Sequence, residues 1–356
     1  MRDTAGVRVR PLAEEDLDEA DRIFRVAFGT FLGMPEPEKF SGDADSVRTR
    51  WKADPGGGLA AELDGRLVGS NFAANWGSVG FFGPLTIAPE YWDRAIAQRL
   101  LDATMELFSA WNTRHVGLFT FAQSAKHVGL YQKYGFWPRF LTAIMSRPVD
   151  PDSRSSSTRI SAVADKDLAN ALEAVGKLTG AVYPGLDLSR EIRAVRTQRL
   201  GDTVLIHDGA GLQGVAICHV GAGTEAGGGS CYVKFGAVRP GPGAERRFGL
   251  LIDACHGLAA DRGASVLVAG ANAGSPAASR PRDSGEAPST SLPGGIAVAR
   301  SARFAPSGSG VCKMIPCTSG SSASWVSVAR MPPAVVVRAT SQAIPSRAAA
   351  LPIERT

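Results

Sequence analysis

The chain has 356 residues and a formal net charge of +5, and its content of 44% hydrophobic and 21% charged residues is typical of a soluble folded protein. The basic residues are scattered and form no run that could follow a phosphate backbone, so we expect no nucleic-acid partner. The N-terminus lacks an apolar leader, and no stretch of about 18 uninterrupted apolar residues occurs. The sequence therefore predicts neither export nor a membrane partner.

The five cysteines all follow residue 217 and form no CxxC pair. A disulfide framework and a zinc site are therefore not expected, and the sequence indicates no other metal site. This cysteine usage predicts a reducing, cytoplasmic location.

A weak internal repeat divides the chain. Residues 7–17 resemble residues 158–168, and residues 100–103 resemble residues 251–254 at the same offset of 151. Such self-similarity indicates a repeated structural unit, and the polar, Ser-rich segment between the copies is typical of a linker. We therefore predict a first domain, a linker and a second, incomplete domain at 1–149, 150–158 and 159–273.

Both copies show the same order of predicted elements. A short strand precedes an amphipathic helix whose early acidic residues suit the positive end of a helix. A hairpin with an Asp-Gly turn follows, at 59–71 and 204–218. A strand, a helix and a further strand are expected at 79–87, 93–110 and 115–122 in the first copy and at 232–238, 244–261 and 265–270 in the second. The order predicts a mixed α/β fold.

The composition changes from about residue 274. Ser, Ala, Pro, Gly and Arg dominate, and no hydrophobic period persists, which predicts little stable structure. Nothing there matches the helix and strands expected at 124–146 in the first copy. We predict that 274–356 is a low-complexity tail, either disordered or read out of frame.

The first strand–loop–helix junction could bind an anion. The strand that ends at Ile87 leads through a short loop into the helix that starts near Asp93. Such a junction presents unpaired backbone N–H groups and the positive end of a helix. Small side chains at Ala95 and Ala97 would let a pyrophosphate approach the backbone. By itself, however, a junction of this kind is more often plain architecture.

A second motif follows the next strand, where residues 124–136 predict a short helix capped by Gly135. Together the two features resemble the GNAT superfamily of N-acetyltransferases, and the resemblance extends over residues 7–146. The family's helix signature L-Y-x-K-x-G-F is similar to residues 130–136. Its loop signature Q/R-x-x-G-x-G/A falls on residues 92–97, where Trp92 and Ala95 depart from it. The resemblance implies two GNAT-like acyl-CoA N-acyltransferase units.

The same resemblance implies acetyl-CoA as co-substrate and transfer of the acetyl group to a primary amine by direct attack in a ternary complex. It makes Tyr131 the general acid, since a phenol stays protonated at neutral pH and can protonate a leaving thiolate. The acceptor would be a small-molecule or peptide amine, and the chain could form a homodimer. Contacts to the co-substrate are implied for Leu85, Thr86, Ile87, Asp93, Arg94, Ala95, Ile96, Ala97 and Ser124.

The sequence does not single out a general base. Residues 75–87, which would flank the thioester, contain no Asp or Glu, so His127, Glu62 and an ordered water remain as alternatives. Several aromatic residues could line or cover the acceptor side, although most are expected in the core: Phe24, Phe28, Phe31, Trp51 and Trp76.

The second copy lacks the tyrosine helix, and aligning its loop at 243–248 with residues 92–97 puts Phe248 where a small residue would face phosphate. We interpret it as a non-catalytic GNAT-like half. An alternative for the whole chain is a catalytically weak acyl-CoA-binding, sensing or interaction module with a GNAT fold. The changes at Trp92 and Ala95 favour this alternative, and the intact residues 130–136 oppose it.

Overall fold

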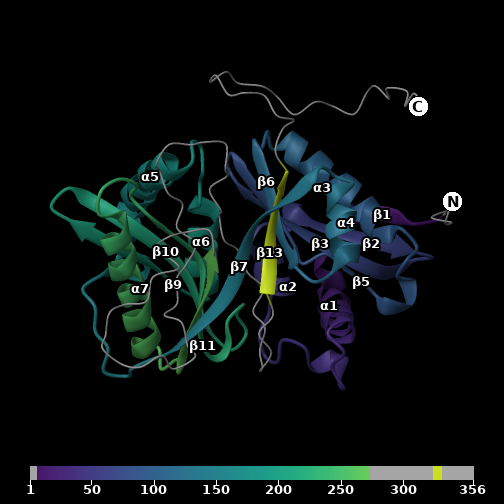
Figure 1. Cartoon of the computed structure of the whole chain (residues 1–356), viewed down its shortest axis with the longest axis horizontal. Coiled ribbons are helices and arrows are strands. Elements are labelled where there is room, and N and C mark those ends of the chain that lie inside the picture. The colour runs from purple at the N-terminus through teal and green to yellow at the C-terminus, as the bar shows by residue number, and fades with distance from the viewer. Residues whose placement is uncertain (1–5, 273–323, 331–356) are drawn as a thin grey trace.

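The computed structural model describes residues 6–272 and the strand 324–330. Apart from that strand, the tail predicted at 274–356 lies outside the described residues. The described chain forms two halves, each a part of the sheet flanked by helices (Figure 1). No described helix is long and apolar enough to cross a lipid bilayer.

Within the described residues, the first half holds four α-helices and seven strands, the last of them long. Its helices are α1 (Leu17–Phe31), α2 (Val47–Ala53), α3 (Ile96–Ala110) and α4 (Ala125–Gln132). Its strands are β1 (Arg8–Pro11), β2 (Gly58–Leu63), β3 (Arg66–Trp76), β4 (Val79–Phe82), β5 (Thr86–Ile87), β6 (His115–Phe121) and β7 (Phe136–Pro148).

The second half follows a similar order. Its helices are α5 (Asp165–Val182), α6 (Ser189–Gln198) and α7 (Ala244–Asp261). Its strands are β8 (Thr158–Arg159), β9 (Gly201–Asp208), β10 (Gly211–Gly221), β11 (Gly227–Val238) and β12 (Val266–Asn272), and β13 (Ser324–Arg330) comes from the tail. Apart from β5 and the short 3-10 turn that follows it, the run β9-β10-β11-α7-β12 matches β2-β3-β4-α3-β6 in the type and order of its elements.

The described strands form one continuous sheet, which confirms a mixed α/β fold. Strand β7 joins the halves, because it runs antiparallel to β12, with Met145 opposite Ala269, and lies at the centre of the molecule (Figure 1). Strand β13 lies between β6 and β7 and is antiparallel to both.

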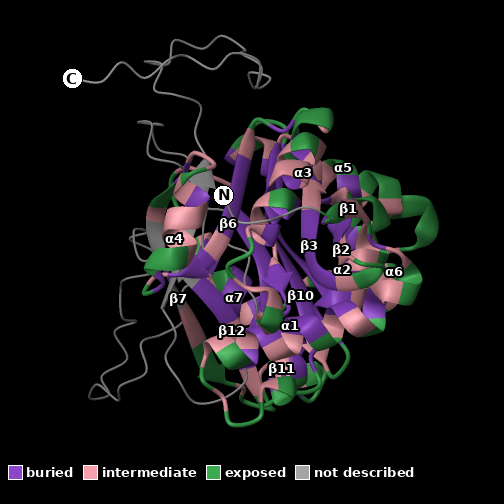
Figure 2. Cartoon of the chain, turned by 90° about the vertical axis from the view of Figure 1, so that its right-hand side faces the viewer, coloured by how far each residue is buried: buried purple, intermediate pink, exposed green. Residues whose placement is uncertain are grey.

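Helices cover both faces of the sheet in the first half. On β2, Ala60 packs with α1 and α2, whereas its neighbours Leu59 and Ala61 pack with α3, as the alternation of side chains along a strand requires. The strands are accordingly buried, while the outer faces of the helices are exposed (Figure 2).

The two halves share a core and a buried ion cluster. Trp76 of β3 packs among apolar side chains of α5, α6 and β10. Arg50 of α2 donates from Nε and from a terminal nitrogen to the two carboxylate oxygens of Glu225, at 2.9 and 2.6 Å. Lys234 of β11 contacts Glu225 at 2.8 Å and also contacts Glu191 of α6. The halves are therefore held together by charged groups as well as by apolar surface.

Candidate active site

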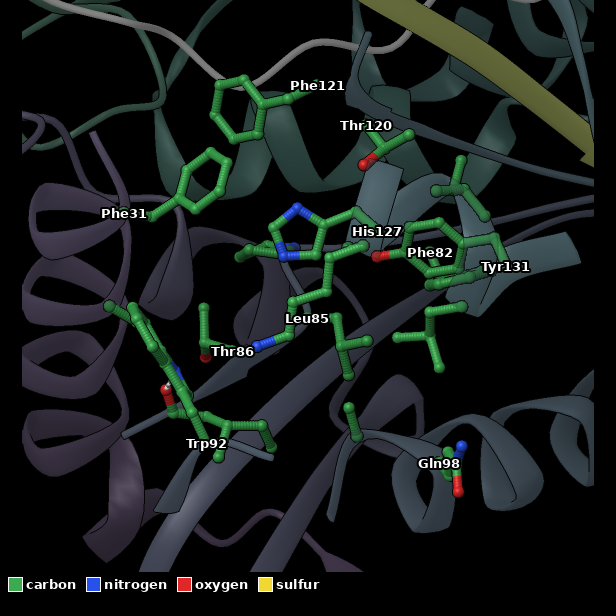
Figure 3. A pocket seen from close by; sticks show the side chains of 18 of the residues that line it. Phe31, Phe82, Leu85, Thr86, Trp92, Gln98, Thr120, Phe121, His127 and Tyr131 are labelled. Atoms are coloured by element: carbon green, nitrogen blue, oxygen red, sulfur yellow. Dashed lines mark hydrogen bonds between the residues drawn. The ribbon is translucent and has the colours of Figure 1, made fainter. Parts of the chain in front are cut away.

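A cavity of about 710 Å³ opens in the first half where β4 and β6 separate. It is lined by α1, the break between β4 and β5, the loop before α3, β6 and α4. Figure 3 shows His127 and Tyr131 projecting into it, with Phe31 and Phe121 on one side and Leu85 and Thr86 on another.

The cavity exists because the strand predicted at 79–87 is broken. Strand β4 pairs in parallel with β6 only as far as Phe81, opposite Gly117. After Pro84, which has no N–H to donate to a ladder, β5 pairs with β3 instead, through Thr86 and Ile87. The two parallel strands therefore diverge and leave a slot between them.

The N-terminus of α3 forms one end of the cavity. Helix α3 begins at Ile96, three residues later than expected, because Asp93 and Ala95 adopt left-handed conformations with φ of 62° and 60°. Trp92 fixes the loop by donating from its indole to the carbonyl oxygen of Ile87 at 2.7 Å. The first turn of a helix leaves backbone N–H groups without intrahelical acceptors, so this end suits an anion.

Ala95 occupies a conformation that costs an alanine about 1 kcal/mol or more relative to glycine. Replacing Ala95 with Gly should therefore stabilise the loop by about 1 kcal/mol. A higher midpoint of denaturant unfolding and tighter acetyl-CoA binding by calorimetry would be observed. An unchanged midpoint would show that the loop is not strained at Ala95.

The second half has the same kind of junction. Helix α7 begins at Ala244 and its N-terminal cap is Gly243, with φ of 76°. Gly243 thus corresponds to Ala95, and the expected correspondence of Phe248 to the phosphate-facing position is wrong. Phe248 is buried in the core between α7 and the sheet.

Tyr131 lies on α4 at the other end of the slot. Its side chain is buried, its ring contacts Phe82 edge-on at 5.9 Å, and it lines the cavity. Burial raises the pKa of the Tyr131 phenol, so its proton is retained at neutral pH. Tyr134 anchors the same helix to α3 by donating to the carbonyl oxygen of Gln98 at 2.9 Å.

His127 precedes Tyr131 by one helical turn and also lines the cavity. Its ring lies 4.9 Å from that of Phe31 on α1, and its Nδ1 is buried with no hydrogen-bond partner among the described residues. Burial and the charge of Lys126 lower the pKa of His127, so the imidazole is neutral at pH 7. This side chain can accept a proton inside the cavity.

The structure brings most of the sequence-derived site residues together. The cavity lining includes Tyr131, Leu85, Thr86, Ile87, Asp93, Ala95, Ile96 and Ala97. Arg94 is not part of the lining and lies over the ring of Tyr91. Ser124, also outside the lining, caps α4 by accepting from the backbone N–H of His127 at 3.4 Å.

Some of the remaining candidate residues line the cavity and others do not. Glu62 is engaged by Arg10 at 2.8 Å and does not line the cavity. Of the five aromatic candidates, Phe28 and Phe31 line it, whereas Phe24, Trp51 and Trp76 pack in the core clusters.

Sequence reasoning missed four phenylalanines and an arginine of the lining, namely Phe81, Phe82, Phe119, Phe121 and Arg50. The alternation in His115–Phe121 (HVGLFTF) was a signal for Phe119 and Phe121. No local signal exists for Arg50, because its partner Glu225 is 175 residues away in the chain.

Comparison with known proteins agrees with this geometry. Residues 20–136 match the model of the acetyltransferase (GNAT) family. The matched residues are therefore similar to this family. Members of this family use acetyl-CoA, and the match ends at Phe136, before the second half begins.

Solved structures similar to the chain include two with this kind of fold. A GCN5-related N-acetyltransferase from Sphaerobacter thermophilus is 15% identical, with 91% of this chain and 95% of that chain covered and a TM-score of 0.50. A protein from Pyrococcus horikoshii that has been proposed to be an acetyltransferase is 16% identical. The alignment covers 74% of this chain and 80% of that chain, with a TM-score of 0.51. A search of curated proteins gave no match.

Across residues 6–272 and 324–330, no group of three or more His, Cys, Asp and Glu side chains is arranged to hold a metal ion.

Proposed function

We propose that the chain is an acetyl-CoA-dependent N-acetyltransferase that transfers the acetyl group to a primary amine by direct attack in a ternary complex. The observation that carries this proposal is the single cavity connecting the N-terminus of α3 with Tyr131 through the slot between β5 and β6. A pyrophosphate fits the helix N-terminus, and an extended pantetheine arm fits the exposed backbone of residues 85–87, as an added strand fits a sheet edge.

Two side chains would move the protons. As the acceptor nitrogen bonds to the thioester carbonyl carbon and the carbon–sulfur bond breaks, Tyr131 donates its hydroxyl proton to the departing sulfur. The proton lost by the nitrogen passes to Nδ1 of His127. Transfer from the imidazolium through solvent then restores the tyrosine proton, so each turnover begins and ends with the same protonation states.

The proposed base predicts a pH dependence. Because the pKa of His127 is lowered below its ordinary value near 6.5, the imidazole stays unprotonated and active at pH 7. We expect kcat/KM to be flat near neutrality and to fall only as the pH drops below that value. Tyr131, one helical turn later on α4, keeps its proton over this range because burial raises the pKa of its phenol.

A pH profile of the His127→Asn variant tests this role. The acidic limb should disappear along with about 10²-fold of the rate. If the limb persists unchanged in the variant, another group or ordered water is the base.

The second half is proposed to be a GNAT-like unit that supports the first without catalysing transfer. The order of its elements is similar to that of the first half. Arg50 links it to the slot, because the guanidinium that is bonded to Glu225 also donates to the carbonyl oxygen of Gly83. This contact sits at the break that separates β4 from β5.

Calorimetry with acetyl-CoA, followed by a thiol-release assay over a panel of amines, tests the proposed function. We expect binding and turnover of at least one amine. Binding without turnover would favour the acyl-CoA-binding or sensing module. The left-handed conformation of Ala95, in the loop before α3, is the observation that supports this alternative. Absence of binding would overturn both.

A further inference from the structure

Side chains from both faces of the strands β4 and β6 line the cavity, so it has two walls. Successive residues on a strand point to opposite faces, and on β4 and β6 the residues Phe82 and Leu118 pack with Tyr131. Their neighbours Phe81 and Phe119 lie on the other face, with ring centroids 5.2 Å apart. The second wall therefore lies on the α1 side of the sheet, away from Tyr131's supporting core.

Helix α1 adds to this wall. Phe28 and Phe31 lie on one stripe of the helix, and the ring of Phe31 is 4.9 Å from that of Phe121. Phe28 lies 6.1 Å from Phe121. Both α1 rings are only half-buried, unlike Phe24 one turn earlier, which is fully buried. We call this set, Phe28, Phe31, Phe81, Phe119 and Phe121, the aromatic wall.

The charge around the aromatic wall limits what it can hold. Asp93 is the one acidic residue among the described lining residues. It lies in the loop before α3 and forms an ion pair with Lys126 at 2.8 Å. Arg50 lines the cavity on the wall's side, but its charge is matched by Glu225. A polycation bound here would bury ammonium groups without carboxylate partners, which is costly.

A single amine attached to a ring buries only one ammonium group, so this cost is smaller. Phenylalanine rings stack offset or edge-to-face on another aromatic ring, and their faces attract one ammonium group before it loses its proton. That ammonium proton is lost to solvent before the attack. His127, whose ring contacts Phe31, lies beside the wall to take the further proton that the nitrogen gives up as it bonds to the thioester carbon.

We propose that the acceptor is a monoamine carrying an aromatic ring, bound against the aromatic wall, with polyamines and aminoglycosides excluded. This inference rests on the proposed acetyl-transfer function, whose substrate class it names. The ring of the acceptor would lie between Phe31 and Phe119, and its amine would point toward the slot and the thioester.

A matched panel tests the proposal on the full chain. The amines are 2-phenylethylamine, 2-cyclohexylethylamine of similar size, spermidine and kanamycin, with thiol release as the readout and acetyl-CoA binding measured on the same preparation. We expect kcat/KM for 2-phenylethylamine to exceed that of each other amine by about tenfold or more. Acetyl-CoA binding with equal or faster turnover of spermidine or kanamycin, or with turnover of no panel member, would overturn this inference. Failure of acetyl-CoA to bind would instead overturn the proposed function.

Two variants locate the preference in the wall. Phe31→Leu keeps an apolar side chain but removes the ring, and it should reduce the ratio of kcat/KM for the aromatic over the cyclohexyl amine about fivefold. Phe31→Glu adds a carboxylate and should shift the preference toward spermidine. Trp137→Leu, an exposed aromatic on β7 outside the cavity, is the matched control and should leave the ratio unchanged. An unchanged ratio in Phe31→Leu, or a change as large in the control, would contradict a role for the wall.

Discussion

The Tyr131→Phe variant should lose about 10²-fold to 10⁴-fold in kcat, the usual contribution of a positioned general acid. The ring that remains keeps the edge-on contact with Phe82 and the packing in the cluster around Phe136. The pocket should therefore retain its shape, and the loss should come from the missing hydroxyl proton at the departing sulfur.

The Tyr131→Phe variant should lower kcat without weakening the binding of acetyl-CoA. The dissociation constant of acetyl-CoA should change less than about twofold, because the phenol acts late, on the leaving group. A Tyr134→Phe variant is the matched control, because Tyr134 follows α4 by two residues and its hydroxyl donates to the carbonyl oxygen of Gln98 without lining the cavity. Equal losses in the two variants would indicate damage to α4 and would remove Tyr131 from the acid role.

The Glu225→Gln variant should lose about 3–5 kcal/mol of unfolding free energy, the usual cost of breaking a buried ion pair from one side. Glu225 is fully buried and contacts both Arg50 and Lys234. With the carboxylate gone, two buried cations share the single remaining acid Glu191. Denaturant unfolding of the whole chain measures the loss.

Two further variants serve as controls for the stability loss of Glu225→Gln. Glu173→Gln removes the partner of Lys177 in an exposed pair on α5 and should leave the unfolding midpoint almost unchanged. Combining Glu225→Gln with Lys234→Met restores equal numbers of buried charges and should recover part of the loss. A single variant as stable as the native chain would show that the cluster does not hold the halves together.

The same cluster predicts sensitivity to acid. The positive charges of Arg50 and Lys234 hold the pKa of Glu225 well below its ordinary value near 4.3. For a depressed carboxyl pKa, the stabilisation is fully present above the unfolded-state value and is lost as the pH falls through the folded-state value. The native chain should therefore lose stability below about pH 4, and Glu225→Gln should flatten that part of the curve.

Sequence alone determined the features that depend on local pattern. The alternation and helical periods placed the strands and helices of the first half, and residues 130–136 located Tyr131 within a motif of seven residues. The resemblance to the GNAT superfamily implied Leu85, Thr86 and Ile87 as co-substrate contacts, on the strand that precedes the loop signature. These inferences use neighbours within a few residues, which is the range over which sequence pattern constrains conformation.

Only the tertiary structure decided the rest. The left-handed backbone at Ala95 and the capping role of Ser124 depend on where α3 and α4 begin, and sequence periods fix such ends poorly. The pairing of Arg50 with Glu225 and the assembly of the aromatic wall from α1, β4 and β6 join residues far apart in the chain. Contacts of that kind are set by the packing of whole elements against one another, and no local pattern encodes them.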